Sequence, residues 1–247
     1  MVKFGSARID ENGHARGGRR GDSTGTECMI QPAYWHPNGW RGIRAKDGNV
    51  ANAIAWVMKV CCISNLVGYN QDERYLIFFT GIQEGVLTNA DCSTLVPFCV
   101  RQAGIDVNVD GIWTGNLIER LMETGAFETF EVKDLNALCV GDILVDGNLT
   151  SHTVIVTDGN ARQLENVFDV AEPTLKLGSK GDEVRKLQRF FNEYGNGCVV
   201  DGDFGGETWL NVSTFQQLFG MAISGIYEQK THDLCCFFLY AKGVHTV

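Results

Sequence analysis

The chain has 247 residues, of which 44% are hydrophobic and 21% charged, with a formal net charge of -9. This length and composition predict a folded protein with one medium and one smaller domain. The negative charge argues against a nucleic-acid binder, because phosphate contacts need clustered lysine and arginine. No run of about 18 apolar residues occurs, so we expect no membrane insertion.

The N-terminus lacks the apolar stretch of a secretory signal, which predicts a product made in the cytoplasm. Nine cysteines are present, but no two have Cys-x-x-Cys spacing, and Cys61-Cys62 and Cys235-Cys236 are adjacent pairs. This pattern supports neither a zinc site nor a secreted disulfide framework. We therefore expect mostly buried free thiols, no metal and no cofactor.

Residues 1–48 are rich in glycine and polar side chains, which predicts a leader of turns and short strands. Its aromatic residues Tyr34, Trp35 and Trp40 are expected to pack on the main body or to line a groove. Helical spacing of apolar residues predicts a buried helix over 49–65, and a second helix is expected over 71–83.

A third helix is predicted from Cys92 to Ala103 and a fourth over 114–124. Three strands should follow, at residues 141–145, 151–156 and 162–168. Helices followed by an antiparallel sheet indicate the α+β class, and we assign residues 1–170 to this first domain.

Residues 171–247 form the second predicted domain. Apolar residues recur at helical spacing in three places, around Val184 to Phe191, Thr208 to Phe215 and Thr231 to Phe238. The pattern predicts a small three-helix domain with its own core.

Cys92 lies in Asp91-Cys92-Ser93-Thr94, where a loop should become a helix. The positive end of the helix dipole stabilises a thiolate, so we predict a pKa below the free value of about 8.5 and a nucleophilic role for Cys92. Free N–H groups at this helix start, including that of Cys92, could stabilise an oxyanion.

A cysteine nucleophile needs a base and a group that orients the base. His152 is the best base, because it begins a strand in the same domain; we expect it to share a face with Val154 and Val156 towards the helix layer. A core histidine bonded to a carbonyl is the alternative. The orienting group should come from the next strand, as Glu165 or Asn166.

Substrate contacts are predicted for Tyr69, Asp91 and Ser93, with a structural role as the alternative.

Three features of the first domain carry a resemblance: Asp-Cys-Ser before an apolar helix, the segment Gly-Asp-Ile-Leu-Val, and a strand that opens with His. Through these features the domain resembles the NlpC/P60 and CHAP branches of the papain-like cysteine peptidases. The resemblance implies a papain-like fold that cuts bacterial peptidoglycan, with Cys92 as nucleophile and His152 as base. The pair Glu165-Asn166 is more similar to the CHAP pattern.

The second domain resembles the type 1 peptidoglycan-binding module, through Leu175-x-x-Gly178-x-x-Gly181, Asp201-Gly202-x-Phe204-Gly205 and Phe215-Gln216. Together the resemblances imply a bacteriophage endolysin-like enzyme whose partner is peptidoglycan and which acts on the wall after release from the cytoplasm. We expect the protein to be a monomer. The anchor would raise the local substrate concentration.

The leading hypothesis is a cysteine-dependent hydrolase of an amide bond in the stem peptide. One alternative is an amidase that uses the same residues on the link between muramic acid and alanine. Another is a non-catalytic wall-binding protein in which Cys92 and His152 are core residues.

Overall fold

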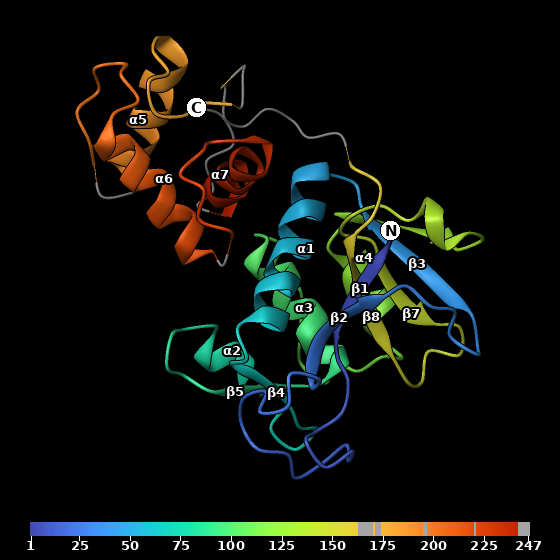
Figure 1. Ribbon diagram of the computed structural model, residues 1–247. Helices are drawn as coiled ribbons and strands as arrows, with labels where there is room; N and C mark the ends of the chain where they lie inside the picture. Colours follow the sequence, from blue (N-terminus) through green and yellow to red (C-terminus); the bar gives the residue numbers. More distant parts are fainter. Residues whose placement is uncertain (163–169, 171–173, 195–196, 220, 242–247) are drawn as a thin grey trace. The chain divides into compact units, whose positions relative to one another are not determined.

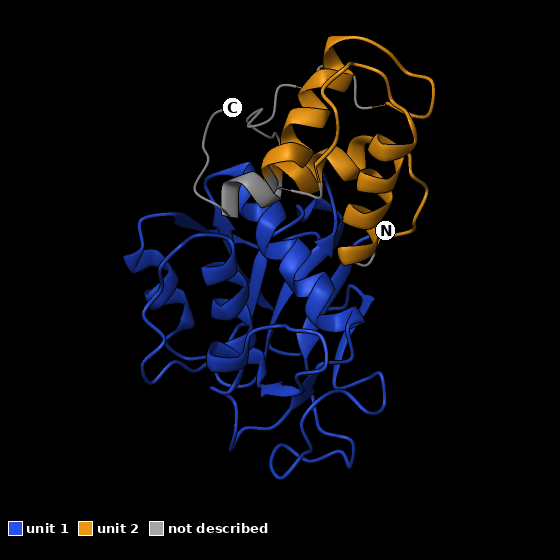
Figure 2. Ribbon diagram, turned by 90° about the vertical axis from the view of Figure 1, so that its left-hand side faces the viewer, with its two compact units in different colours: residues 1–165 blue, residues 166–247 orange. Residues whose placement is uncertain are grey.

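The computed structural model describes residues 1–162, 170, 174–194, 197–219 and 221–241. The chain divides into two compact units, unit 1 from Met1–Glu165 and unit 2 from Asn166–Val247 (Figure 2). This division lies a few residues before the predicted boundary at 170. Among the described residues, no helix combines the length and apolar character needed to cross a membrane.

Unit 1 is built on a six-stranded sheet with the strand order β2-β1-β8-β7-β3-β6, and each neighbouring pair is antiparallel (Figure 1). The strands are β1 (Lys3–Ala7), β2 (Cys28–Pro32), β3 (Trp40–Ala45), β6 (Phe127–Glu131), β7 (Ile143–Asp146) and β8 (Thr153–Asp158). The α+β class is confirmed. Because β1 lies between β2 and β8, the predicted leader is part of the sheet.

Two helices, α1 (Gly48–Ile63) and α3 (Cys92–Gln102), contact each other and lie against β1 and β8 on one face of the sheet (Figure 1). The side chain of Asp47 caps α1 by accepting a hydrogen bond from the N–H of Asn49 at 2.7 Å. Gly5 faces α1 so closely that a Cβ atom there would lie 2.5 Å from Met58. The predicted helix over 49–65 is confirmed.

The opposite face of the sheet carries an apolar cluster. Its buried members are Val2, Phe4, Trp40, Val132, Leu138, Leu144, Val154 and Val156. Val154 and Val156 therefore point away from α1, and the expected orientation of this strand was wrong. Alternation along a strand identifies its two faces but not which one a helix covers, because that depends on strands distant in sequence.

The connection between α1 and α3 contains a second sheet, in which β4 (Val67–Tyr69) pairs in parallel with β5 (Thr88–Ala90). The helix predicted over 71–83 is reduced to the four-residue α2 (Ile77–Thr80). It ends at Gly81, whose φ of 63° lies in the left-handed region that stops a helix. The prediction was wrong in length because the turn after Asn70 delays the start of this helix.

Two short elements follow α3 before the last strands of the sheet. They are α4 (Leu117–Glu123), within the predicted range 114–124, and the 3-10 helix η1 (Leu135–Ala137). Strands β7 and β8 correspond to the predicted strands at 141–145 and 151–156. Beyond Arg162, the third predicted strand lies outside the described residues.

Unit 2 contains α5 (Asp182–Tyr194), α6 (Gly206–Leu218) and α7 (Gln229–Ala241). Two buried glutamines connect successive elements of this unit. The Nε2 of Gln188 donates to Thr208 Oγ1 at 3.2 Å, and that of Gln216 donates to Thr231 Oγ1 at 3.0 Å. The Oε1 of Gln216 also accepts the N–H of Gly225 at 3.0 Å. Each glutamine thus fixes the start of the next helix.

Candidate active site

Cys92 is the first residue of α3, and Asp91 caps this helix. The Oδ1 of Asp91 accepts the N–H of Thr94 at 2.8 Å, and the Asp91 N–H donates to Thr94 Oγ1 at 3.0 Å, which completes a capping box. Two reciprocal hydrogen bonds hold the backbone on both sides of Cys92. The predicted transition from loop to helix at this cysteine is therefore present.

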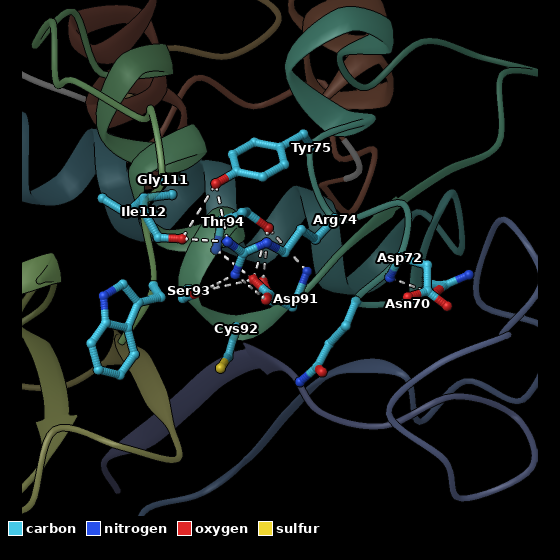
Figure 3. Close-up of polar contacts among 12 residues, drawn as sticks. Asn70, Asp72, Arg74, Tyr75, Asp91, Cys92, Ser93, Thr94, Gly111 and Ile112 are labelled. Carbon is cyan, nitrogen blue, oxygen red and sulfur yellow. Dashed lines mark hydrogen bonds and ion pairs between the residues drawn. The ribbon is translucent and has the colours of Figure 1, made fainter. Parts of the chain in front are cut away.

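Arg74 connects the start of α3 to two other segments (Figure 3). Its Nη1 lies 3.1 Å from Asp91 Oδ2, and its Nη2 donates to the carbonyl oxygen of Ile112 at 2.7 Å and to Tyr75 Oη at 3.0 Å. Ser93 Oγ donates to Asp91 Oδ1 at 2.9 Å. This network lies on the side of the helix start away from the sulfur of Cys92 and holds the loop at Ile112 against it.

The sulfur of Cys92 lies against the start of β8. Its Sγ is 3.9 Å from the carbonyl oxygen of Ser151, and the residue is only 7% exposed. Burial, with a smaller contribution from the carboxylate of Asp91, raises the pKa of the thiol to about 12, against the opposing effect of nearby N–H groups such as that of Thr153. The prediction of a lowered pKa was wrong, because desolvation outweighs the helix dipole here.

His152 immediately precedes β8 and is half-buried. Its ring centroid lies 6.4 Å from that of Trp40. Burial, together with electrostatic interactions with Arg8 and His36, lowers the pKa of His152 to about 4, while Asp146 opposes this shift. At neutral pH the imidazole is therefore uncharged and able to accept a proton.

Asp146 shapes the turn that carries His152, and sequence reasoning missed it. Its Oδ2 accepts the N–H groups of Thr150 at 2.9 Å, Ser151 at 2.7 Å and His152 at 3.2 Å. Burial raises the pKa of Asp146, but these hydrogen bonds outweigh burial and lower the pKa to about 2. The turn-forming sequence Asp146-Gly147-Asn148 was the available signal.

Side chains from residues 1–48 border this region. The ring of His36 lies 5.2 Å from that of Trp40, and its Nε2 is 3.4 Å from Ser151 Oγ. Tyr34 packs edge-on against Trp40 at 5.7 Å and accepts the indole N–H at its carbonyl oxygen. Ser151 thus contacts Cys92 through its backbone and His36 through its side chain. The predicted leader contributes aromatic walls to the candidate site.

Of the remaining predicted site residues, three lie in the described part of unit 1 and two lie outside the described residues. Tyr69 ends β4, is buried, and accepts a hydrogen bond from Gln71 Nε2 at its hydroxyl, at 3.2 Å. Asp91 and Ser93 belong to the capping network, and their predicted contacts with substrate stay predictions. Glu165 and Asn166 lie outside the described residues. Within the described part of the chain, no cluster of three or more His, Cys, Asp or Glu side chains could hold a metal ion.

Comparison with known families assigns a class to this architecture. A family model described as an endolysin-like domain matches residues 4–163, and the chain belongs to that family. A second model, described as a putative peptidoglycan binding domain, matches residues 180–234. No curated protein and no solved structure matches the chain. An endolysin-like domain followed by a peptidoglycan-binding domain supports a cell-wall hydrolase function.

Proposed function

We propose that the protein is a cysteine-dependent peptidoglycan hydrolase that cleaves an amide bond of the stem peptide. The observation that carries the proposal is the position of Cys92 at the start of α3, with its Sγ 3.9 Å from the carbonyl oxygen of the residue preceding His152. We assign unit 1 to the papain-like enzymes of the NlpC/P60 and CHAP type, because the candidate nucleophile lies at a helix start and contacts the backbone that leads into a histidine at a strand start.

In the proposed reaction, Cys92 Sγ attacks the carbonyl carbon of the substrate amide while His152 accepts the thiol proton. The N–H of Cys92, at the first position of α3, is suited to stabilise the oxyanion. His152 then donates the proton to the leaving amine, and a thioester joins the acyl group to Cys92. Water, deprotonated by His152, hydrolyses the thioester and restores the thiol.

The pKa values favour a neutral resting pair. With the pKa of Cys92 near 12 and that of His152 near 4, the proton lies on sulfur at neutral pH. His152 therefore acts as a general base during attack, rather than as the partner of a preformed thiolate. We propose that Glu165 or Asn166 orients the imidazole through its other nitrogen.

The proposal is tested by adding the full-length protein to Gram-positive cell walls. We expect Cys92→Ala to abolish clearing, whereas Cys139→Ala, at a thiol of unit 1 that is only half-buried, should clear at the wild-type rate. The Cys92→Ala protein should still sediment with walls, because attachment is assigned to unit 2. Clearing by Cys92→Ala would refute the nucleophile, and wall binding without clearing by the wild type would favour a non-catalytic binding protein.

Mass spectrometry of the released fragments identifies the bond. A new amine within the stem peptide is the expected product, whereas a new amine on its first alanine would identify the protein as an amidase. Separate Glu165→Gln and Asn166→Ala variants test which residue orients the imidazole. Substitution of the orienting residue should lower kcat and change the acid limb of the pH profile while leaving wall binding intact.

A further inference from the structure

Four cysteines from three elements of unit 1 gather on the helix-covered side of the sheet. Cys28 begins β2, Cys61 and Cys62 lie in the last turn of α1, and Cys99 lies in α3. The Sγ atoms of Cys28 and Cys62 are 3.6 Å apart, and the thiols of Cys61 and Cys99 hydrogen-bond each other. The cluster is separate from Cys92 and has no part in the proposed reaction.

Solvent reaches the members of this cluster unequally. Cys28 and Cys61 are each 1% exposed and Cys99 is 0% exposed, whereas Cys62 is only partly buried. The hydrogen bond with Cys62, followed by burial, raises the pKa of Cys28 well above its usual range. Thiol–disulfide exchange needs an accessible attacking sulfur, so a soluble oxidant meets Cys62 first.

We propose that Cys28 and Cys62 are a redox-active dithiol that forms a disulfide by exchange with a low-molecular-weight disulfide. In the first step the Cys62 thiolate attacks the oxidant RSSR, which gives a mixed disulfide on Cys62 and releases one thiol, RSH. Cys28 then attacks the Sγ of Cys62, its proton passes to the departing sulfur, and a second RSH leaves. Two protein thiols are oxidised and one external disulfide is reduced.

The surroundings of the pair allow the bond to form. A disulfide has an S–S length of about 2.0 Å, so the two sulfurs must approach by roughly 1.5 Å. Both partners lie where the structure can adjust, because β2 is an edge strand of the sheet and α1 ends at Ile63, one residue after Cys62. Cys28 and Cys62 also belong to elements that are already in contact.

Other pairings within the cluster are less favourable. Cys61 and Cys62 are consecutive residues of a helix, so their side chains point about 100° apart around its axis. Cys61 and Cys99 contact each other, but both are buried from a soluble oxidant. Cys62 is therefore the cysteine of the cluster that a soluble oxidant reaches, and Cys28, whose Sγ lies 3.6 Å away, is its most favourable partner.

The disulfide would enclose the segment between β2 and the end of α1. This segment carries Tyr34, His36 and Trp40, which border the candidate site, but not Cys92 itself. Closing a loop of about 35 residues restricts the unfolded chain, and for a domain of this size we expect the Tm of unit 1 to rise by roughly 10 °C. The thiol of Cys92 stays reduced, because it is buried and its sulfur faces Ser151.

The test uses the full-length protein equilibrated with oxidised glutathione, blocked with N-ethylmaleimide, and digested with trypsin. Cleavage at arginine and lysine places Cys28 in the peptide 21–41, and Cys61 and Cys62 together in the peptide 60–74. We expect these two peptides to be joined by a disulfide, with the loss of two hydrogen atoms, and Cys92 to be recovered with the maleimide label after unfolding.

Two variants of neighbouring cysteines distinguish the partners. Cys62→Ala should abolish the cross-link and the rise in Tm, while Cys61→Ala should retain both. Fragmentation of the wild-type cross-linked peptide locates the bond without any variant. Glutathione on Cys62 with Cys28 still free, a bond from Cys28 to Cys61, or a cross-link that survives Cys62→Ala would each overturn the proposal.

Discussion

Replacing Asp146 by asparagine should weaken unit 1 and slow the proposed reaction. The carboxylate accepts three backbone N–H groups at one oxygen and that of Asn148 at the other, at 3.1 Å. An amide has nearly the same shape but only one acceptor oxygen, so Asp146→Asn directs an NH2 group at N–H donors. The turn that presents Ser151 to Cys92 would lose its charge-assisted hydrogen bonds.

The lowered pKa sets the size of this effect. The pKa of Asp146 is about 2 in the folded protein, against about 3.9 in an unfolded chain, which corresponds to about 2 to 3 kcal/mol of unfolding free energy at neutral pH. Because the folded pKa is the lower one, this stability is present above pH 4 and is lost as the pH falls towards 2. The difference between wild type and variant should shrink over the same range.

Urea unfolding of both proteins between pH 3 and pH 7 measures the difference. Asp134→Asn is the matched control, because Asp134 is exposed and its carboxylate accepts the backbone N–H of Asn136 in a 3-10 turn. We expect less than about 1 kcal/mol from the control. The clearing rate of Asp146→Asn should fall by roughly 10- to 100-fold through misplacement of His152. An equal difference in stability at pH 3 and pH 7 would refute the role of the charge.

Four further predictions concern other residues. Arg8→Gln should raise the pKa of His152, because it removes a positive charge that lowers it, and an NMR titration of the imidazole measures the change. Gly141→Ala should lower the Tm of unit 1 by more than about 5 °C, since the residue has a φ of 82° and a Cβ would clash with α1. Gln216→Leu should cost about 2 to 4 kcal/mol in unit 2 by leaving buried N–H groups without an acceptor, as denaturant unfolding would show. The kcat/KM for a soluble peptidoglycan fragment should fall as the pH drops through about 4, where the His152 imidazole becomes protonated. It should stay level up to pH 8, because the Cys92 thiol remains protonated over that range. A change in kcat/KM between pH 6 and pH 8 would contradict this prediction.

Local patterns predicted the parts of the fold that depend on neighbouring residues. The apolar spacing before Ile63 defines α1, and the polar triplet at Cys92 defines the start of α3, because helix periodicity and capping operate within one or two turns. The short strands predicted in residues 1–48 are also present, because turn-forming glycine and polar residues likewise act on their near neighbours. What the pattern could not supply was their place in the sheet.

Long-range pairing accounts for the features of the site that were missed. β1 pairs with β8 across about 150 residues, and β3 pairs with β7 across about 100, which brings Tyr34, His36 and Trp40 to the turn of His152. No local signal reports such neighbours. The error in the pKa of Cys92 has the same origin, since the helix dipole is a local property whereas burial comes from segments distant in sequence, such as the turn that carries Ser151.

The burial of Cys92 and His152 determines how their proton can move. The pKa of the Cys92 thiol is about 12 and that of the His152 imidazole about 4, so an isolated transfer of the proton from thiol to imidazole is strongly unfavourable before the attraction between the new charges is counted. A resting thiolate is therefore strongly disfavoured. In the proposed reaction, negative charge that forms on the substrate oxygen, beside the first N–H groups of α3, would lie in a more favourable field than charge held on sulfur. Proton transfer should accordingly accompany formation of the S–C bond, so that the buried site holds its charge only while substrate is attached.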